Sequence, residues 1–177
     1  MKLFIGCASS NDVPEFYLND CKILIDKLLK ENDLVYGAYN EGLMGICYES
    51  AKENNNKVFG KCVSVDKEYL DNIDCDSKEV YETIMDRTKS LVYESDAVII
   101  LPGGIGTLNE LFATIDSKRT GLFDKPIIIY NSNHYYDELL SFLDKLYNEK
   151  FSPIDVKNTY YVTDDKEKVL SLLKKGI

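Results

Sequence analysis

The residues best suited to chemistry lie in a turn rich in glycine that follows an apolar run. Ala97–Leu101 is typical of an interior strand of a parallel sheet, and Pro102 ends it because proline has no N–H to donate. The turn then contains three glycines, Gly103, Gly104 and Gly106. A helix is expected to open at Thr107, and N–H groups at a helix N-terminus lack partners and carry the positive end of the helix dipole. The turn is therefore a candidate anion site, most often for phosphate.

The same residues also have a purely structural interpretation. Thr107 and Glu110 stand at the spacing of a capping box, in which Glu110 would only accept a hydrogen bond from a backbone N–H. The spacing does not match the Walker A motif, because no lysine follows the last glycine, and it fits G-x-G-x-x-G no better. The turn alone leaves ligand binding and structural capping equally open.

The composition of the 177 residues indicates a globular protein with a real core, since 45% of them are hydrophobic. We expect one domain over residues 1–177. The net charge of -9 argues against a nucleic-acid partner, because phosphate backbones need a basic surface. No apolar run is long enough to span a bilayer, and the N-terminal apolar stretch is too short for a signal peptide. We therefore expect a cytoplasmic protein with no membrane partner.

The cysteines and the single histidine form no pattern that binds metal. The five cysteines are odd in number and widely spaced, without C-x-x-C, which argues against a disulfide framework or a structural zinc site. Buried free thiols are the preferred interpretation. His134 lies in the loop-like stretch Asn131–Tyr136 and is not expected to be catalytic. The sequence thus predicts no metal.

The apolar pattern predicts alternating strands and helices that would position the turn. Strands are expected at Leu3–Cys7, Asp33–Gly37, Lys57–Val63, Ala97–Leu101, Pro126–Tyr130 and Asn158–Val162. Helices are expected at Pro14–Lys30, Gly45–Asn54, Lys78–Glu94, from Thr107, at Tyr135–Asn148 and after a capping Asp164. Residues 64–78 carry no clear pattern. The alternation predicts an α/β fold, with a mostly parallel sheet of about six or seven strands and helices on both faces.

Three of the turns are expected to share one rim of the sheet. They are Cys7–Asp12, Gly37–Gly45 and Pro102–Thr107, and each follows a predicted strand. Parallel sheets bind ligands at the carboxyl ends of their strands. The convergence of these turns favours a real binding site there.

Four blocks of the sequence, in order, resemble the Lonely Guy family of nucleotide phosphoribohydrolases, also labelled lysine decarboxylase-like. Pro102–Glu110 matches the family motif P-G-G-x-G-T-x-x-E, and Ala8–Ser10 is similar to its Gly-Ser-Ser turn. Leu34–Gly45 resembles its L-V-Y-G-G-G-x-x-G-L-M-G segment, and Asp124–Pro126 matches its D-K-P. The resemblance covers nearly the whole chain.

The resemblance implies a Rossmann-like homodimer that hydrolyses the N-glycosidic bond of a nucleoside 5'-monophosphate, with no cofactor. The substrate would be a cytokinin ribotide or AMP, and the products the free base and ribose 5-phosphate. It implies Arg87 and Glu110 as the catalytic residues: Glu110 would stabilise an oxocarbenium-like transition state and activate a water, and Arg87 would orient Glu110 and the phosphate. The expected substrate- and phosphate-binding residues are Ser9, Ser10, Gly42, Thr88, Gly103, Gly104, Ile105, Gly106, Thr107, Leu108, Asn109 and Asp116.

The sequence departs from the family pattern at three places. Where the family has Met-His-x-Arg-Lys, Ile84–Thr88 lacks the histidine and the lysine, and the triple glycine is reduced to Gly37–Tyr39. Tyr39 would close part of the pocket or stack on a base. Asp116 falls where the family tends to have threonine, which leaves the preferred base open.

The departures from the family pattern and the older family label suggest two alternative functions. A nucleotide or cofactor carrier without hydrolysis stays open as the alternative. A lysine decarboxylase is disfavoured, because pyridoxal phosphate chemistry needs a Schiff-base lysine and nothing in the sequence marks one.

Overall fold

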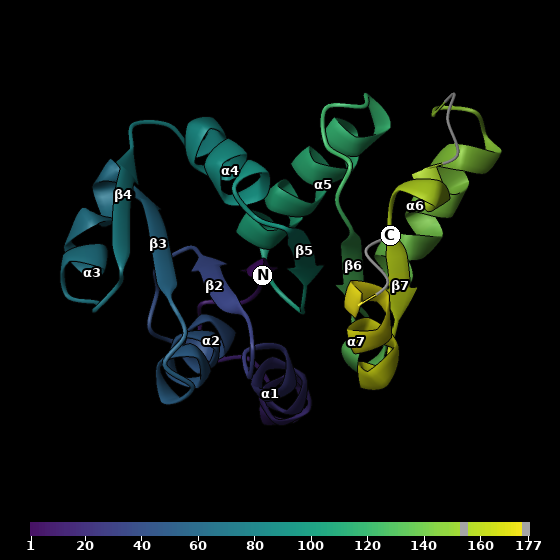
Figure 1. Cartoon of the computed structure of the whole chain (residues 1–177). Helices are drawn as coiled ribbons and strands as arrows, with labels where there is room; N and C mark the ends of the chain where they lie inside the picture. Colours follow the sequence, from purple (N-terminus) through teal and green to yellow (C-terminus); the bar gives the residue numbers. More distant parts are fainter. Residues whose placement is uncertain (153–155, 175–177) are drawn as a thin grey trace.

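The computed structural model describes residues 1–152 and 156–174 and contains one sheet of seven strands (Figure 1). The strands run in the order β4-β3-β2-β1-β5-β6-β7, and every neighbouring pair is parallel. Their bounds are β1 Lys2–Gly6, β2 Asp33–Tyr36, β3 Val58–Val63, β4 Ser77–Tyr81, β5 Ala97–Ile100, β6 Ile127–Tyr130 and β7 Tyr161–Thr163. The α/β, Rossmann-like prediction is confirmed.

Helices cover both faces of this sheet (Figure 1). They are α1 Glu15–Leu28, α2 Gly42–Glu53, α3 Lys67–Asp71, α4 Ile84–Tyr93, α5 Ile105–Arg119, α6 Asp137–Asn148 and α7 Lys166–Lys174. Short 3-10 turns are η1 Ser64–Asp66, η2 Ser132–His134 and η3 Val156–Thr159. No helix in the described part of the chain is long and apolar enough to cross a membrane.

The core has two halves because successive side chains of a strand point to opposite faces. Leu3 and Ile5 of β1 pack into the half that includes α1, α2 and α7. Phe4, between them, packs into the half that includes α4, α5 and α6. The strand-to-helix turns at the carboxyl ends of β1, β2 and β5 lie between these two layers.

The prediction of a helix over Lys78–Glu94 was wrong for about the first third of that stretch. Ser77–Tyr81 forms the edge strand β4, and α4 begins only at Ile84. Thr83 caps α4, because its Oγ1 accepts a hydrogen bond from the Asp86 N–H at 3.1 Å. An edge strand buries at most one face, so β4 alternates between half-buried and exposed residues and has no apolar run that would predict a strand.

Several other boundaries differ from the prediction. The last strand is Tyr161–Thr163, and part of the expected Asn158–Val162 is the turn η3. Asp165, not Asp164, caps α7, because its Oδ1 accepts from the Glu167 N–H at 2.8 Å. The stretch 64–78 that had no clear pattern contains η1 and α3.

Candidate functional site

The three turns expected on one rim are hydrogen-bonded to one another. The Ala8 N–H donates to the Pro102 carbonyl at 3.0 Å, and the Met44 N–H donates to the Ala8 carbonyl at 3.1 Å. The Gly42 N–H donates to Asn11 Oδ1 at 2.8 Å, and Gly42 has a φ of 57°, which glycine adopts readily. The predicted convergence of the three turns is therefore confirmed. They meet where the chain, after adding β2, β3 and β4 on one side of β1, continues with β5 on the other side.

The helix after the glycine turn begins earlier than expected, which excludes the capping-box interpretation. Gly104 is the N-cap residue and α5 starts at Ile105, so Thr107 lies inside the first turn. The Thr107 hydroxyl donates to the Cys7 carbonyl at 3.2 Å, and so ties α5 to the end of β1. Glu110 is consequently not a capping residue, and its carboxylate is available for another role.

The start of α5 is open to a ligand. Gly104, Ile105 and Gly106 are exposed, and no atom lies within 4 Å of where a Cβ would stand on either glycine. Beside it lies a cleft of about 290 Å³. Its lining includes the predicted Ser9, Ser10, Gly103 and Gly104, together with Val13, Pro14, Tyr17, Leu43 and Tyr135. An exposed helix N-terminus at such a cleft can bind an anionic group.

Arg87 and Glu110 form an ion pair between α4 and α5. Arg87 Nη1 donates to Glu110 Oε1 at 3.1 Å, and the two side chains are only 13% and 3% exposed. Gly37, after β2, allows this placement: a Cβ there would lie 2.3 Å from Arg87 Nη2. The two residues that the resemblance implies as catalytic are thus in direct contact.

The Glu110 carboxyl group has a raised pKa and a buried oxygen without a partner among the described residues. Burial raises its pKa to about 7, although the Arg87 guanidinium works in the opposite direction. Its second oxygen, Oε2, is buried and has no hydrogen-bond partner among the described residues. A buried carboxylate with one unused oxygen is costly to maintain, and such groups concentrate at functional sites.

The remaining predicted residues are divided between the rim and a groove between α4 and α5. Asn109 Nδ2 donates to Thr88 Oγ1 at 3.2 Å and so links the two helices beside the ion pair. Thr88 also lines the groove, as does Asp116, whose exposed carboxylate pairs with Arg119. Leu108 packs against the core and has no free polar group to offer a ligand.

Two aromatic residues at the site were not predicted as binding residues. The Tyr135 hydroxyl donates to the Gly103 carbonyl at 2.8 Å, which fixes the glycine turn from the opposite side of the cleft. Tyr17 meets Tyr135 edge to face, with ring centroids 5.3 Å apart. Tyr39 does not line this cleft: its ring lies 5.1 Å from that of Tyr69, and its hydroxyl is close enough to Arg87 for the guanidinium charge to act on the Tyr39 pKa. No local sequence signal marks Tyr135, because its contact with Gly103 depends on the folded chain.

In the described part of the chain, neither the histidine nor any cysteine is paired with Arg87 or Glu110, although the Glu110 charge helps to raise the pKa of the Cys7 thiol. His134 is exposed and pairs with Asp137 at 3.2 Å. All five cysteines are free thiols; Cys7, Cys21, Cys47 and Cys62 are buried and Cys75 is half-buried. In the described ranges, no three His, Cys, Asp or Glu side chains are grouped so as to hold a metal ion.

Comparisons with known proteins agree with the motifs. A family model described as possible lysine decarboxylase matches residues 44–173. A probable cytokinin riboside 5'-monophosphate phosphoribohydrolase of Arabidopsis thaliana is 35% identical over 151 residues, covering 83% of this chain and 74% of that protein. A protein of the same description from Oryza sativa subsp. japonica is 30% identical over 176 residues, covering 98% of this chain and 70% of that protein.

A solved structure shows the same fold. The Moco carrier protein from Chlamydomonas reinhardtii superposes with a TM-score of 0.71 at 17% identity, covering 98% of this chain and 95% of that one. At that identity the likeness concerns the fold alone. On the matched residues and the sequence relatives, the chain belongs to the Lonely Guy family, whose family model is described as possible lysine decarboxylase.

Proposed function

We propose that this protein hydrolyses the N-glycosidic bond of a nucleoside 5'-monophosphate, a cytokinin ribotide or AMP, without a cofactor. The observation that carries the proposal is the buried Glu110 carboxylate, paired with Arg87 at 3.1 Å beside the open start of α5. The relatives at 30% and 35% identity, named as cytokinin riboside 5'-monophosphate phosphoribohydrolases, support the reaction class.

In the proposed reaction the first turn of α5 holds the phosphate. The N–H groups of Ile105, Gly106 and Thr107, with the hydroxyls of Ser9 and Ser10, are the donors available near the cleft. With the phosphate fixed there, the ribose would have to extend from the cleft toward Glu110, which does not itself line the cleft. The 5'-phosphate thus serves as the binding handle, and the bond that breaks lies at the other end of the sugar.

Glu110 would then act on the ribose carbon that carries the base. As the C1'–N bond breaks, the electron pair leaves with the base and positive charge develops on the sugar, where a carboxylate stabilises it. A water oxygen bonds to C1', Glu110 takes a proton from that water, and the departing base takes up a proton from solvent at its ring nitrogen. Glu110 then releases its proton to solvent, which restores the carboxylate. A pKa of about 7 suits this exchange, because it lies near the pH at which the reaction would run.

The test is release of free base from AMP and from its N6-isopentenyl analogue, followed by chromatography. We expect release by the native protein and its loss in Glu110→Gln, with binding of the nucleotide retained. The ratio of the two substrates would report the base preference. Equal release by native protein and by Glu110→Gln would refute the assignment of Glu110.

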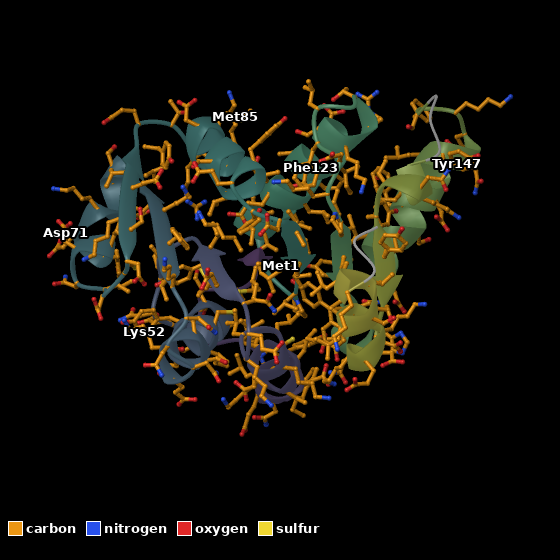
Figure 2. The ribbon with its side chains drawn as sticks, in the orientation of Figure 1. Met1, Lys52, Asp71, Met85, Phe123 and Tyr147 are labelled. Atoms are coloured by element: carbon orange, nitrogen blue, oxygen red, sulfur yellow. The ribbon has the colours of Figure 1, made fainter. Side chains whose placement is uncertain are left out.

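The proposal includes a homodimer, supported by exposed apolar side chains near the site. They lie on α4, on α5 and in the loop after α5, and are Ile84, Met85, Ile105, Phe112 and Leu122. Met85 projects from the outer side of α4 (Figure 2) and is 71% exposed. Grouped exposed apolar residues are typical of protein interfaces. A second copy on this surface would cover the α4–α5 groove.

The dimer is tested by light scattering coupled to size-exclusion chromatography. We expect a dimer for the native chain and a monomer for Met85→Glu. The matched control is Val65→Glu, since Val65 is 86% exposed on η1, and we expect it to stay dimeric. A native chain that is monomeric at micromolar concentration would contradict the dimer.

A nucleotide or cofactor carrier without hydrolysis is the second candidate. Around Arg87 the chain lacks the histidine and lysine of the family pattern, and a structural neighbour is named a Moco carrier protein. Stoichiometric binding of a nucleotide or of molybdenum cofactor, with no base released from a nucleotide panel, would favour this candidate.

A further inference from the structure

Lys61 is a lysine whose side chain is completely buried. It lies in β3, and its residue exposure is 0%. The ammonium donates to Glu79 Oε1 of β4, to Ser90 Oγ of α4 and to Oε2 of Glu94, the C-cap residue of α4, each at 2.8 Å. All three N–H bonds of the ammonium therefore have an acceptor, and the charge is matched by carboxylates from two different elements.

The acceptors around Lys61 are themselves connected. The Ser90 hydroxyl donates to Glu94 Oε1 at 2.6 Å, and the Tyr81 hydroxyl contacts Glu79 Oε2. Burial alone would lower the pKa of Lys61, but the hydrogen bonds to Glu79 and Glu94 outweigh it and raise the pKa above its ordinary value. The cluster is thus charged and fully bonded at neutral pH.

The backbone of the same residue holds the catalytic arginine. The Lys61 carbonyl accepts a hydrogen bond from Arg87 Nε at 3.0 Å. Arg87, Ser90 and Glu94 are spaced by three and four residues, so they lie on one face of α4. Lys61 therefore contacts that face at two levels. Its backbone carbonyl accepts from Arg87, and its ammonium donates to Ser90 and Glu94, about one and two turns further along.

A charge is not needed at this position for stability alone. Buried ion pairs are often no better for stability than apolar residues of similar volume. The Lys61 pairs instead provide orientation. Hydrogen bonds are directional, so they fix the rotation and the position of α4 relative to β3 and β4, whereas apolar packing tolerates small displacements of the helix. The end of Arg87 that this leaves free is Nη1, which reaches Glu110.

We infer that Lys61 is a positioning residue of the Arg87–Glu110 pair, and that the contacts of its buried ammonium with the partly exposed Glu79 and Glu94 hold α4 where Arg87 meets Glu110. The catalytic meaning of the inference rests on the proposed function. The geometric part does not, since it concerns the contact between two side chains of the free protein. The two parts can therefore be tested separately.

The geometric part is tested by titrating Glu110 with carboxyl ¹³C NMR, which needs no substrate. Lys61→Met removes the three ammonium contacts and keeps the backbone carbonyl that accepts from Arg87. We expect α4 to shift, the Arg87 charge to move away from Glu110, and the pKa of Glu110 to rise by about one unit. Arg87→Gln sets the upper limit of that rise. Lys52→Met is the matched control, because Lys52 pairs with Asp74 at 2.7 Å on the surface; it should leave the Glu110 titration unchanged.

A second variant separates positioning from stability. Lys61→Met together with Glu79→Gln and Glu94→Gln leaves no buried charge unpaired, so it should recover thermal stability. We expect its Glu110 titration to stay displaced and, if base release is detected in the native protein, kcat to stay about tenfold lower, with less change in KM. Recovery of the native titration along with the stability would overturn the inference.

A folding failure of Lys61→Met does not remove the test. Glu94→Gln keeps the pair between Lys61 and Glu79 and weakens only the contact of the Lys61 ammonium with the C-terminal end of α4. We therefore expect a smaller rise in the pKa of Glu110. An unchanged Glu110 titration in every folded variant of the cluster would also overturn the inference. Absence of base release by the native protein would refute the proposed function and leave the NMR result readable.

Discussion

Two acidic residues of this molecule, Asp20 and Glu110, are each paired with one cation but in opposite ways. Asp20 accepts from the Tyr130 hydroxyl at 2.8 Å, from Ser132 and from Lys166. Among the described residues, the Glu110 carboxylate accepts from Arg87 alone. Burial tends to raise the pKa of both carboxyl groups; the hydrogen bonds of Asp20 outweigh it and lower that pKa, whereas the pKa of Glu110 stays raised at about 7.

The difference separates a structural carboxylate from a candidate catalytic one. Asp20 joins α1 to β6, η2 and α7, and its partners stabilise the charged form. Glu110 Oε2, by contrast, is buried beside Gly6 at the end of β1 and has no hydrogen-bond partner among the described residues. A carboxylate that stabilises the fold is fully bonded, and one kept for a ligand is not. Substitutions at the two positions should therefore have opposite effects on stability and activity.

The largest expected effect is the loss of activity in Glu110→Gln. Removing the carboxylate removes both the charge that stabilises the sugar cation and the base that accepts the proton of water. We expect kcat for base release to fall by about 10²–10⁴-fold. Asp20→Asn is the control, and its kcat per folded molecule should stay within about twofold of the native value. A similar loss of kcat in both variants would contradict the distinction.

The next effect is the pH dependence of the native protein. Glu110 must be ionised to act, and its pKa is about 7, so kcat/KM should rise about tenfold per pH unit below pH 7 and level off above it. The measurement is kcat/KM from pH 5 to pH 9 with a saturable nucleotide substrate. A level profile from pH 5 upward would mean that the ionisation of Glu110 does not control the reaction.

A smaller effect is a gain of stability in Glu110→Gln. The folded pKa of Glu110 is raised, so its ionisation weakens the native state as pH rises from about 4.5 through 7. Glutamine avoids that cost, and we expect the variant to be more stable than the native chain at pH 8 by up to about 3 kcal/mol, since one pKa unit corresponds to about 1.4 kcal/mol. Urea unfolding at pH 8 and pH 4 measures it, and the gain should vanish at pH 4.

The sequence predicted those secondary-structure elements whose residue pattern is local, and it missed those that depend on contacts between distant residues. Buried strands such as Ala97–Ile100 are apolar throughout and were predicted, as was the glycine turn that follows. The edge strand Ser77–Tyr81 was missed, because a half-exposed strand alternates weakly and carries charged residues. Thr107 fitted a capping box by spacing, but the helix begins at Ile105, and local spacing does not fix where a glycine turn ends.

The sequence predicted that three turns meet at the site, but not the side-chain contacts that position its residues. Arg87 and Glu110 were identified through the family motif, yet their contact depends on how α4 and α5 cross the sheet. Lys61 carried no signal, since a lysine in a strand is most often exposed and only the fold surrounds it with Glu79 and Glu94. The pairing of buried charges is a property of tertiary structure, so it is the part that sequence patterns leave undetermined.

The smallest effect is the loss of stability in Asp20→Asn, and it provides the sharpest contrast with Glu110. The folded pKa of Asp20 is lowered, so its charge stabilises the native state above its unfolded pKa and is lost only in acid. The amide leaves the Lys166 ammonium without its anion, and we expect a loss of about 1–3 kcal/mol at pH 7 that shrinks toward low pH. Urea unfolding at pH 7 and pH 3 measures it. Stabilisation of Asp20→Asn at pH 7, alongside stabilisation of Glu110→Gln at pH 8, would mean that burial dominates at both positions. An unbonded oxygen would then not distinguish the candidate catalytic carboxylate from the structural one.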